Sequence, residues 1–115
     1  MSRDEKVSVV EAFFDCITRK ELDRLPIHPE ITFQSPLIPE LSGEAAARDY
    51  LKAVAAALKS IRVMQHIVEG DHVATFLEEE TINGPLPIFA KFQIASGRIK
   101  DVRVFYDPRR IAGST

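Results

Sequence analysis

The sequence has few of the features that mark extracellular, membrane or nucleic-acid-binding proteins. Its one cysteine, Cys16, cannot form an internal disulfide, and we expect its thiol to pack among apolar neighbours. No apolar run approaches the roughly 20 residues that a membrane helix requires. The net charge of −2 provides no basic surface suited to nucleic acid. We therefore expect neither a membrane nor a nucleic acid as a partner.

Motifs for metal, phosphate and serine chemistry are also missing. His28, His66 and His72 lack a spacing suited to one metal site, and no cluster of cysteines or carboxylates completes one. There is no Gly-rich phosphate loop and no Gly-x-Ser-x-Gly elbow. These absences argue against nucleotide chemistry and the usual serine hydrolases. The sequence implies no metal and no cofactor.

What is present fits one globular domain spanning residues 1–115. Hydrophobic residues make up 45% of the chain and charged residues 28%, which is ordinary for a globular protein. A chain of this length can bury a core without disulfides. It begins with a charged stretch that leads directly into a helical pattern, which is not the layout of a secretory signal. We therefore expect a cytoplasmic location.

The first half of the chain predicts two helices with a short strand between them. Val7, Val10, Phe14 and Ile17 recur with helical spacing and form one wide apolar stripe. Residues 31–35 alternate like a short strand, and prolines punctuate a loop up to residue 41. The serine at position 42 is the expected N-cap of an alanine-rich helix that continues to about residue 58.

The second half predicts an antiparallel meander. Turn pairs such as Asn83-Gly84 separate four runs of β-forming residues: 61–69, 72–82, 86–95 and 98–106. Two helices followed by long antiparallel strands is the order of an α+β cone, in which a strongly bent antiparallel sheet wraps over helices and encloses a cavity. In the first of these strands, alternation predicts that Gln65, and not His66, faces the cavity with Val63 and Ile67.

Three segments carry a family resemblance: Ile-Thr-Phe-Gln-Ser-Pro at 31–36, Ser-Gly-Glu-Ala-Ala at 42–46, and Gly-Arg-Ile-Lys-Asp-Val-Arg-Val-Phe-Tyr-Asp at 97–107. Together with the first amphipathic helix, they resemble the nuclear transport factor 2-like (NTF2-like) superfamily, which has a cystatin-like α+β barrel fold. Within it, the chain is similar to the ketosteroid isomerase and SnoaL-like polyketide cyclase group. The resemblance implies a deep apolar pocket and a homodimer.

The resemblance also indicates where catalytic groups would lie, and this chain lacks them. Phe13 stands where ketosteroid isomerases have a tyrosine, Ser35 where they have the proton-carrying aspartate, and Ala90 where they have a protonated aspartic acid. Val104 occupies the position of an inward aspartate in epoxide-hydrolase-like members. Steroid isomerisation by the usual mechanism is therefore not expected.

One acidic run offers a replacement group. In a strand, Phe76, Glu78 and Glu80 share one face, so Glu78 lies in the cavity if Phe76 lines it. Apolar surroundings would raise the pKa of this carboxyl and suit it to general acid or base catalysis. The alternative is a solvated charge run, since a shift of one residue in strand register exchanges the two faces. Tyr50 and Tyr106 either pack structurally or orient an oxygen of a ligand.

We therefore expect a cavity that binds a small apolar molecule, with Glu78 as the proton carrier. The expected lining residues are Phe13, Phe33, Ser35, Tyr50, Phe76, Ala90, Phe92, Val104 and Tyr106. Two functions stay open. One is a cofactor-free acid–base enzyme of the isomerase, cyclase or hydratase type, and the other is a non-catalytic ligand-binding or dimerisation module.

The outer face of the sheet is the expected homodimer interface. Leu77, Phe89 and Phe105 would form an exposed apolar patch there, which is costly without a partner. Alternation also sends Arg103 to this face. We expect Arg103 to form an interface contact or a structural ion pair, with ligand binding as the alternative.

Overall fold

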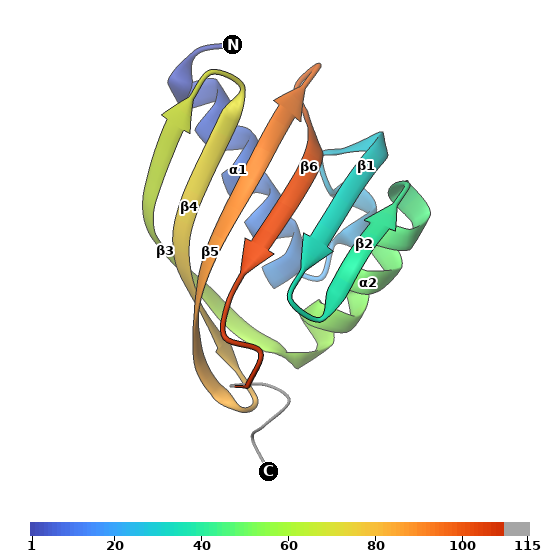
Figure 1. The fold of residues 1–115 in the computed structure, drawn as a ribbon, viewed down its shortest axis with the longest axis vertical. Coiled ribbons are helices and arrows are strands. Elements are labelled where there is room, and N and C mark those ends of the chain that lie inside the picture. The colour runs from blue at the N-terminus through green and yellow to red at the C-terminus, as the bar shows by residue number, and fades with distance from the viewer. Residues whose placement is uncertain (110–115) are drawn as a thin grey trace.

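The computed structural model describes residues 1–109 and confirms the α+β fold. Its elements are helices α1 (Arg3–Thr18) and α2 (Glu44–Ala57), the 3-10 turn η1 (Leu22–Arg24), and strands β1 (Ile27–Ser35), β2 (Ile38–Ser42), β3 (Leu58–Glu69), β4 (His72–Thr81), β5 (Gly84–Ala95) and β6 (Arg98–Phe105). The strands form one sheet in the order β2-β1-β6-β5-β4-β3 (Figure 1). Neither helix in this part of the chain is long and apolar enough to cross a membrane. A cytoplasmic location stays a prediction.

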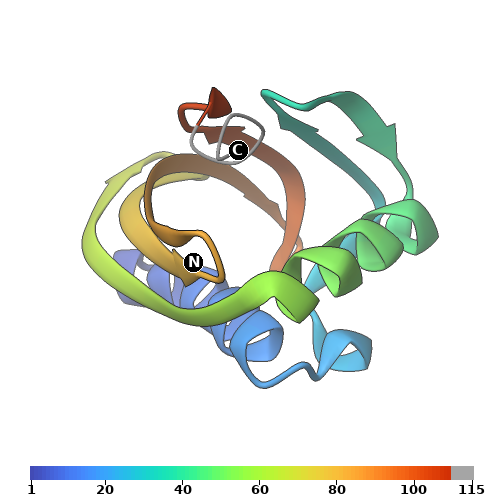
Figure 2. The same ribbon diagram turned by 90° about the horizontal axis from the view of Figure 1, so that it is seen from below.

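The sheet is mixed and strongly curved. Strands β3 to β6 form consecutive antiparallel hairpins, as the turn pairs predict, whereas β1 runs parallel to β6. A parallel pair needs a long connection, and here that connection contains α2 and the first three strands of the meander. Figure 2 shows the sheet curling over α1 and α2, which lie on its concave side. The core therefore lies between the concave face and the helices.

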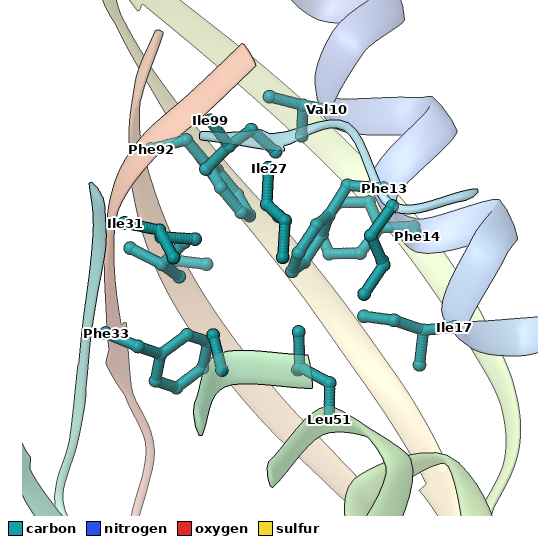
Figure 3. Packing of buried hydrophobic residues seen from close by; sticks show 14 of the residues in the cluster. Val10, Phe13, Phe14, Ile17, Ile27, Ile31, Phe33, Leu51, Phe92 and Ile99 are labelled. Atoms are coloured by element: carbon teal, nitrogen blue, oxygen red, sulfur yellow. The ribbon is translucent and has the colours of Figure 1, made fainter. Parts of the chain in front are cut away.

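Helix α1 begins at a capping box and buries most of the predicted apolar stripe. The Ser2 hydroxyl accepts a hydrogen bond from the Glu5 backbone N–H at 3.2 Å, and the Glu5 carboxylate accepts one from the Ser2 N–H at 2.9 Å. The rings of Phe13 and Phe14 pack edge-to-face on Phe92 of β5, with centroids 5.5 Å and 5.6 Å apart. Figure 3 shows both side chains projecting from α1 into the core.

The segment between β1 and α2 differs from the prediction. In place of an irregular loop, β2 pairs antiparallel with β1. The N-cap of α2 is Gly43 and not Ser42, because the chain turns there with φ of +94°, which glycine adopts without a steric penalty. The Gly43 N–H donates to the Ile31 carbonyl at 2.8 Å. This bond ties the start of α2 to the sheet.

A β-bulge in β3 reverses the predicted orientation of the second half of that strand. Val63 and Gln65 pair with consecutive residues of β4, so Met64 is an extra residue on β3. After the bulge, Gln65 and Ile67 are exposed, whereas His66 turns toward α1. The prediction that Gln65 faces inward was wrong, because simple alternation cannot include an inserted residue.

The inward orientation of His66 links three elements. Its Nδ1 lies 2.8 Å from the Oγ1 of Thr75 on β4, and its Nε2 lies 3.3 Å from a carboxylate oxygen of Glu11 on α1. Thr75 is fully buried. His66 therefore satisfies a buried hydroxyl and connects α1 to the sheet.

Candidate functional site

A cavity of about 300 Å³ lies between the concave face of the sheet and the helices. Its walls are mostly apolar, and its volume is in the range of small-molecule sites. Most of the residues expected to line a pocket do line this cavity: Phe13, Phe33, Ser35, Tyr50, Ala90, Phe92, Val104 and Tyr106. Their contact with a ligand stays a prediction.

The other two expected lining residues, Phe76 and Glu78, lie outside the cavity. Phe76 is 45% exposed and packs edge-to-face on Phe89, with ring centroids 4.8 Å apart. The Glu78 carboxylate accepts a hydrogen bond of 3.5 Å from the guanidinium of Arg62. The placement of a proton carrier at Glu78 was therefore wrong, and this residue belongs to a charged outer face.

The register of β4 against β5 explains the difference. The predicted strands leave three residues, 83–85, between them, whereas the hairpin has a two-residue turn at 82–83, so Thr81 pairs with Gly84. In this register Glu79 lies opposite Leu86. Directly opposed residues in an antiparallel pair share a face of the sheet. Glu79 therefore points into the cavity, together with Leu77 two residues before it.

The sequence contains a pattern from which the inward orientation of Glu79 could have been predicted. Strand β5 alternates clearly, and the buried residues on its inner face are Leu86, Ile88, Ala90, Phe92 and Ile94. In a two-residue hairpin, paired residues of the two strands lie on the same face of the sheet, so the inner face of β5 determines which residues of β4 point inward. The acidic run 78–80 offers no preference of its own, because consecutive glutamates occur on both faces. The inner face of β4 has to be derived from β5.

Glu79 is the carboxyl that lines the cavity. Burial raises the pKa of this carboxyl from 4.5 to about 7. None of the ion pairs formed within residues 1–109 involves Glu79. A carboxylate without a cationic partner is costly in apolar surroundings. The neutral acid is therefore the favoured form below neutral pH.

The hydroxyl groups of Ser35 at the end of β1, Tyr50 on α2 and Tyr106 after β6 also line the cavity. Burial is the main cause that raises the pKa of the Tyr50 hydroxyl. The Ser35 hydroxyl lowers this pKa, and the nearby Tyr106 and Glu79 raise it further. These effects place Ser35, Tyr106 and Glu79 close to the Tyr50 hydroxyl. Together with Thr81 and Asn83, these four residues form the polar part of the cavity wall.

The Ser35 hydroxyl is buried without a satisfied hydrogen bond. Ser35 is 8% exposed, and its Oγ meets no partner with ordinary hydrogen-bond geometry among the described residues, although it is close enough to Tyr50 to lower that group's pKa. Buried hydroxyls are nearly always paired, because an unpaired one costs free energy. Ser35 Oγ is therefore available to hydrogen-bond a molecule in the cavity.

Other candidate groups contribute less to this site. Within residues 1–109, no three His, Cys, Asp or Glu side chains lie close enough together to hold a metal ion. Cys16 is half-buried, and burial, followed by nearby Glu21 and Asp15, raises the pKa of its thiol. A raised pKa makes a thiol a weaker nucleophile at neutral pH. Glu79 is thus the better candidate for proton transfer.

Several solved structures share this fold at low sequence identity. A de novo designed protein with a curved β-sheet has a TM-score of 0.87 at 19% identity, covering 99% of this chain and 94% of that one. An NTF2-like protein of unknown function from Cytophaga hutchinsonii has a TM-score of 0.82 at 15% identity, covering 93% and 94%. An LEH-like epoxide hydrolase from M. tuberculosis has a TM-score of 0.82 at 16% identity, covering 96% and 89%. At these identities the likeness shows the fold alone, and one fold hosts many functions.

The sequence itself also matches a family. The profile of the SnoaL-like domain matches residues 10–103, whereas no curated protein matches the chain. The matched segment contains both helical walls of the cavity and Glu79. The resemblance to SnoaL-like and NTF2-like proteins is confirmed, and the chain belongs to the SnoaL-like domain family.

Proposed function

We propose that this protein binds a small, largely apolar molecule in its cavity and exchanges a proton with it through Glu79, without a cofactor. The proposed reaction class is isomerisation, cyclisation or hydration. One observation carries the proposal: a carboxyl with a pKa of about 7 lies in a wall that is otherwise mostly apolar. A pKa near the working pH suits a general acid or base.

The surrounding groups support this chemistry. At pH 7 about half of the Glu79 carboxyls are ionised, so the same group can take a proton from a carbon beside a carbonyl and return it to another atom. Negative charge then develops on the ligand oxygen. The hydroxyls of Ser35 and Tyr50 are able to donate hydrogen bonds to such an oxygen. Proton transfer and charge stabilisation would thus come from different elements of the fold.

Exchange of the α-protons of 2-tetralone for deuterium tests Glu79 without knowledge of the natural substrate. This exchange needs a base beside the carbonyl, and NMR follows it in D₂O. We expect the wild type to accelerate exchange over buffer, and Glu79→Gln to lose roughly 100-fold of the protein-catalysed rate. The matched control is Glu78→Gln, which makes the same change on the outer face and should keep the rate. Undiminished exchange by Glu79→Gln would contradict the proposed role.

A non-catalytic binding module is the second candidate. The absence of acidic or phenolic groups at Phe13, Ser35 and Ala90 favours it. A binding module would bind 2-tetralone in the cavity, and neither the wild type nor any variant would accelerate exchange. Binding and exchange measured on the same samples therefore separate the two functions.

We also propose that a second copy of the chain covers the outer face of the sheet. Phe76, Phe89 and Phe105 form an aromatic row across β4, β5 and β6, and Phe105 is 56% exposed. Exposed apolar faces of this kind are typical of interfaces. Leu77, which was predicted for this face, is instead 1% exposed in the core because of the β4 register.

The distribution of charge favours a second copy as the partner. Lys91 lies on one side of the aromatic row and Glu80 on the other, and neither forms an ion pair within residues 1–109. A two-fold axis along the row would bring the Lys91 side of each copy against the Glu80 side of the other. Arg103, which was expected to form an interface contact or a structural ion pair, forms an ion pair with Asp101, with 3.3 Å between Nε and Oδ2.

A further inference from the structure

The size of the cavity limits the size of its ligand. A protein cavity of about 150 Å³ holds one benzene ring, and this cavity has about twice that volume. Two fused rings therefore fit within it. A rigid skeleton of four fused rings would have to extend out of the cavity into solvent.

The charge of the cavity wall limits the charge of the ligand. None of the described lining residues is a lysine, arginine or histidine, so the buried part of an anionic ligand would have no cationic partner there. Ionised Glu79 would also repel an anion. A cationic amine could pair with Glu79, but burial of both charges costs most of what the pair gains. A neutral ligand avoids both costs.

The polar groups of the wall determine how the ligand would be oriented. Ser35 Oγ is buried, lacks a satisfied hydrogen bond and lines the cavity. The Tyr50 hydroxyl lies near it, and the Tyr50 ring packs on Phe33 with centroids 5.2 Å apart. A second part of the wall is formed by the mutually packed rings of Phe13, Phe14 and Phe92. One part of the wall thus suits an oxygen atom of the ligand, and another suits the apolar part of the ligand.

We infer that the natural ligand is a neutral molecule about the size of two fused rings, with one oxygen that accepts hydrogen bonds from Ser35 and Tyr50. This inference rests on the proposed function, because it requires a ligand in this cavity. It makes Ser35 a specificity-determining residue in place of the base that the family resemblance would put there. It requires only the binding part of that function, and not proton transfer by Glu79.

Calorimetric titration at pH 6 with probes built on one skeleton tests the inference. The probes are tetralin, 2-tetralone, tetralin-2-carboxylate and 2-aminotetralin, with androstenedione as a four-ring ketone. We expect 2-tetralone to bind about tenfold more tightly than tetralin, because one or two hydrogen bonds each add a few-fold in affinity. The two charged probes and androstenedione should bind at least roughly tenfold more weakly than 2-tetralone.

Two variants test whether the hydroxyls of Ser35 and Tyr50 cause the tighter binding of 2-tetralone. Ser35→Ala should weaken 2-tetralone binding about fivefold and leave tetralin binding unchanged. Tyr50→Phe is a second variant with the same expected pattern, and it keeps the ring that packs on Phe33. The matched control is Ser60→Ala, which removes an exposed hydroxyl on β3. Ala53→Phe adds bulk at a lining position of α2 and should weaken every probe.

The outcomes distinguish this inference from the proposed function. If no probe binds the wild type, the proposed function fails and this inference fails with it. If tetralin and 2-tetralone bind equally, or if neither Ser35→Ala nor Tyr50→Phe changes their ratio, the inference alone is wrong. Tighter binding of a charged probe or of androstenedione would overturn the assignment of charge or of size, while the proposed function would stand.

Discussion

Glu79 and Leu86 lie opposite each other across β4 and β5, and this pair places the carboxyl of Glu79 inside the cavity. Glu78, one position earlier, lies outside and contacts Arg62. Two adjacent glutamates thus experience opposite environments. The difference makes Glu78 an internal control for every experiment on Glu79.

The raised pKa of Glu79 predicts that the protein loses stability as pH rises from about 4.5 to above 7. Below pH 4.5 this carboxyl is protonated in both the folded and the unfolded chain. Between the two pKa values the unfolded chain releases the proton first, so the folded state becomes less favourable. The full loss corresponds to about 3 kcal/mol. Urea denaturation of the wild type at pH 4 and pH 8 measures it.

Glu79→Gln should lack this pH-dependent loss, whereas Glu78→Gln should retain it. If the difference in unfolding free energy between pH 4 and pH 8 is the same in all three proteins, Glu79 is not buried as a neutral acid.

The rate of proton exchange should rise with pH, whereas the unfolding free energy should fall. The base that removes a proton is ionised Glu79, so the protein-catalysed exchange of 2-tetralone should rise between pH 5 and pH 8 with a midpoint near 7. NMR in D₂O, corrected for the buffer rate, measures this profile. A profile that follows only the buffer rate would argue for the non-catalytic module.

Removal of the unsatisfied Ser35 hydroxyl should stabilise the protein without ligand. Ser35→Ala eliminates a buried polar atom that makes no compensating hydrogen bond, and we expect a gain of about 1 kcal/mol in unfolding free energy. Ser60→Ala should change the free energy by less than about 0.5 kcal/mol, as is usual for exposed positions. Thermal or urea unfolding compares them. A loss of stability in Ser35→Ala would show that this hydroxyl is already paired.

Disruption of the aromatic row should dissociate the proposed dimer. Phe105→Ser removes an exposed ring near the end of β6, and we expect sedimentation velocity at micromolar concentration to show a monomer, while the wild type sediments as a dimer. Leu37→Ser is the control, because it removes an exposed apolar side chain in the turn between β1 and β2. A monomeric wild type would refute the interface.

His66 should contribute to stability through Thr75 more than through Glu11. His66→Phe leaves the fully buried Thr75 hydroxyl without its partner, and we expect a loss of about 1 to 2 kcal/mol. Glu11→Gln should cost about 0.5 kcal/mol or less, because the Glu11 side chain is largely exposed. Urea denaturation at pH 8 measures both variants. Equal losses would mean that the contact with α1 carries the effect.

Much of the cavity could be predicted because its walls follow local patterns. The stripe that contains Phe14 and Ile17 has helical periodicity, and the alternation in residues 86–94 needs no information from elsewhere in the chain. The family resemblance added Phe13, Ser35 and Ala90 as wall positions. All three line the cavity.

The misplaced residues share a different origin. Phe76 and Glu78 were assigned to the wrong face because the predicted strands leave three residues in the turn between β4 and β5, whereas the hairpin has two. Gln65 was assigned to the wrong face because Met64 is an extra residue opposite β4. In each case a shift of one residue exchanges the two faces of a strand.

The sequence by itself determined the order of helices and strands apart from β2, the antiparallel hairpins of β3 to β6 and the apolar character of the cavity wall, because periodicity and turn residues act over short distances. Only the tertiary structure decided that β1 pairs with β6, that β3 contains a bulge and that Glu79 is the buried carboxyl. These features depend on contacts between residues far apart in the chain. Such contacts form only when the sheet has closed over the helices.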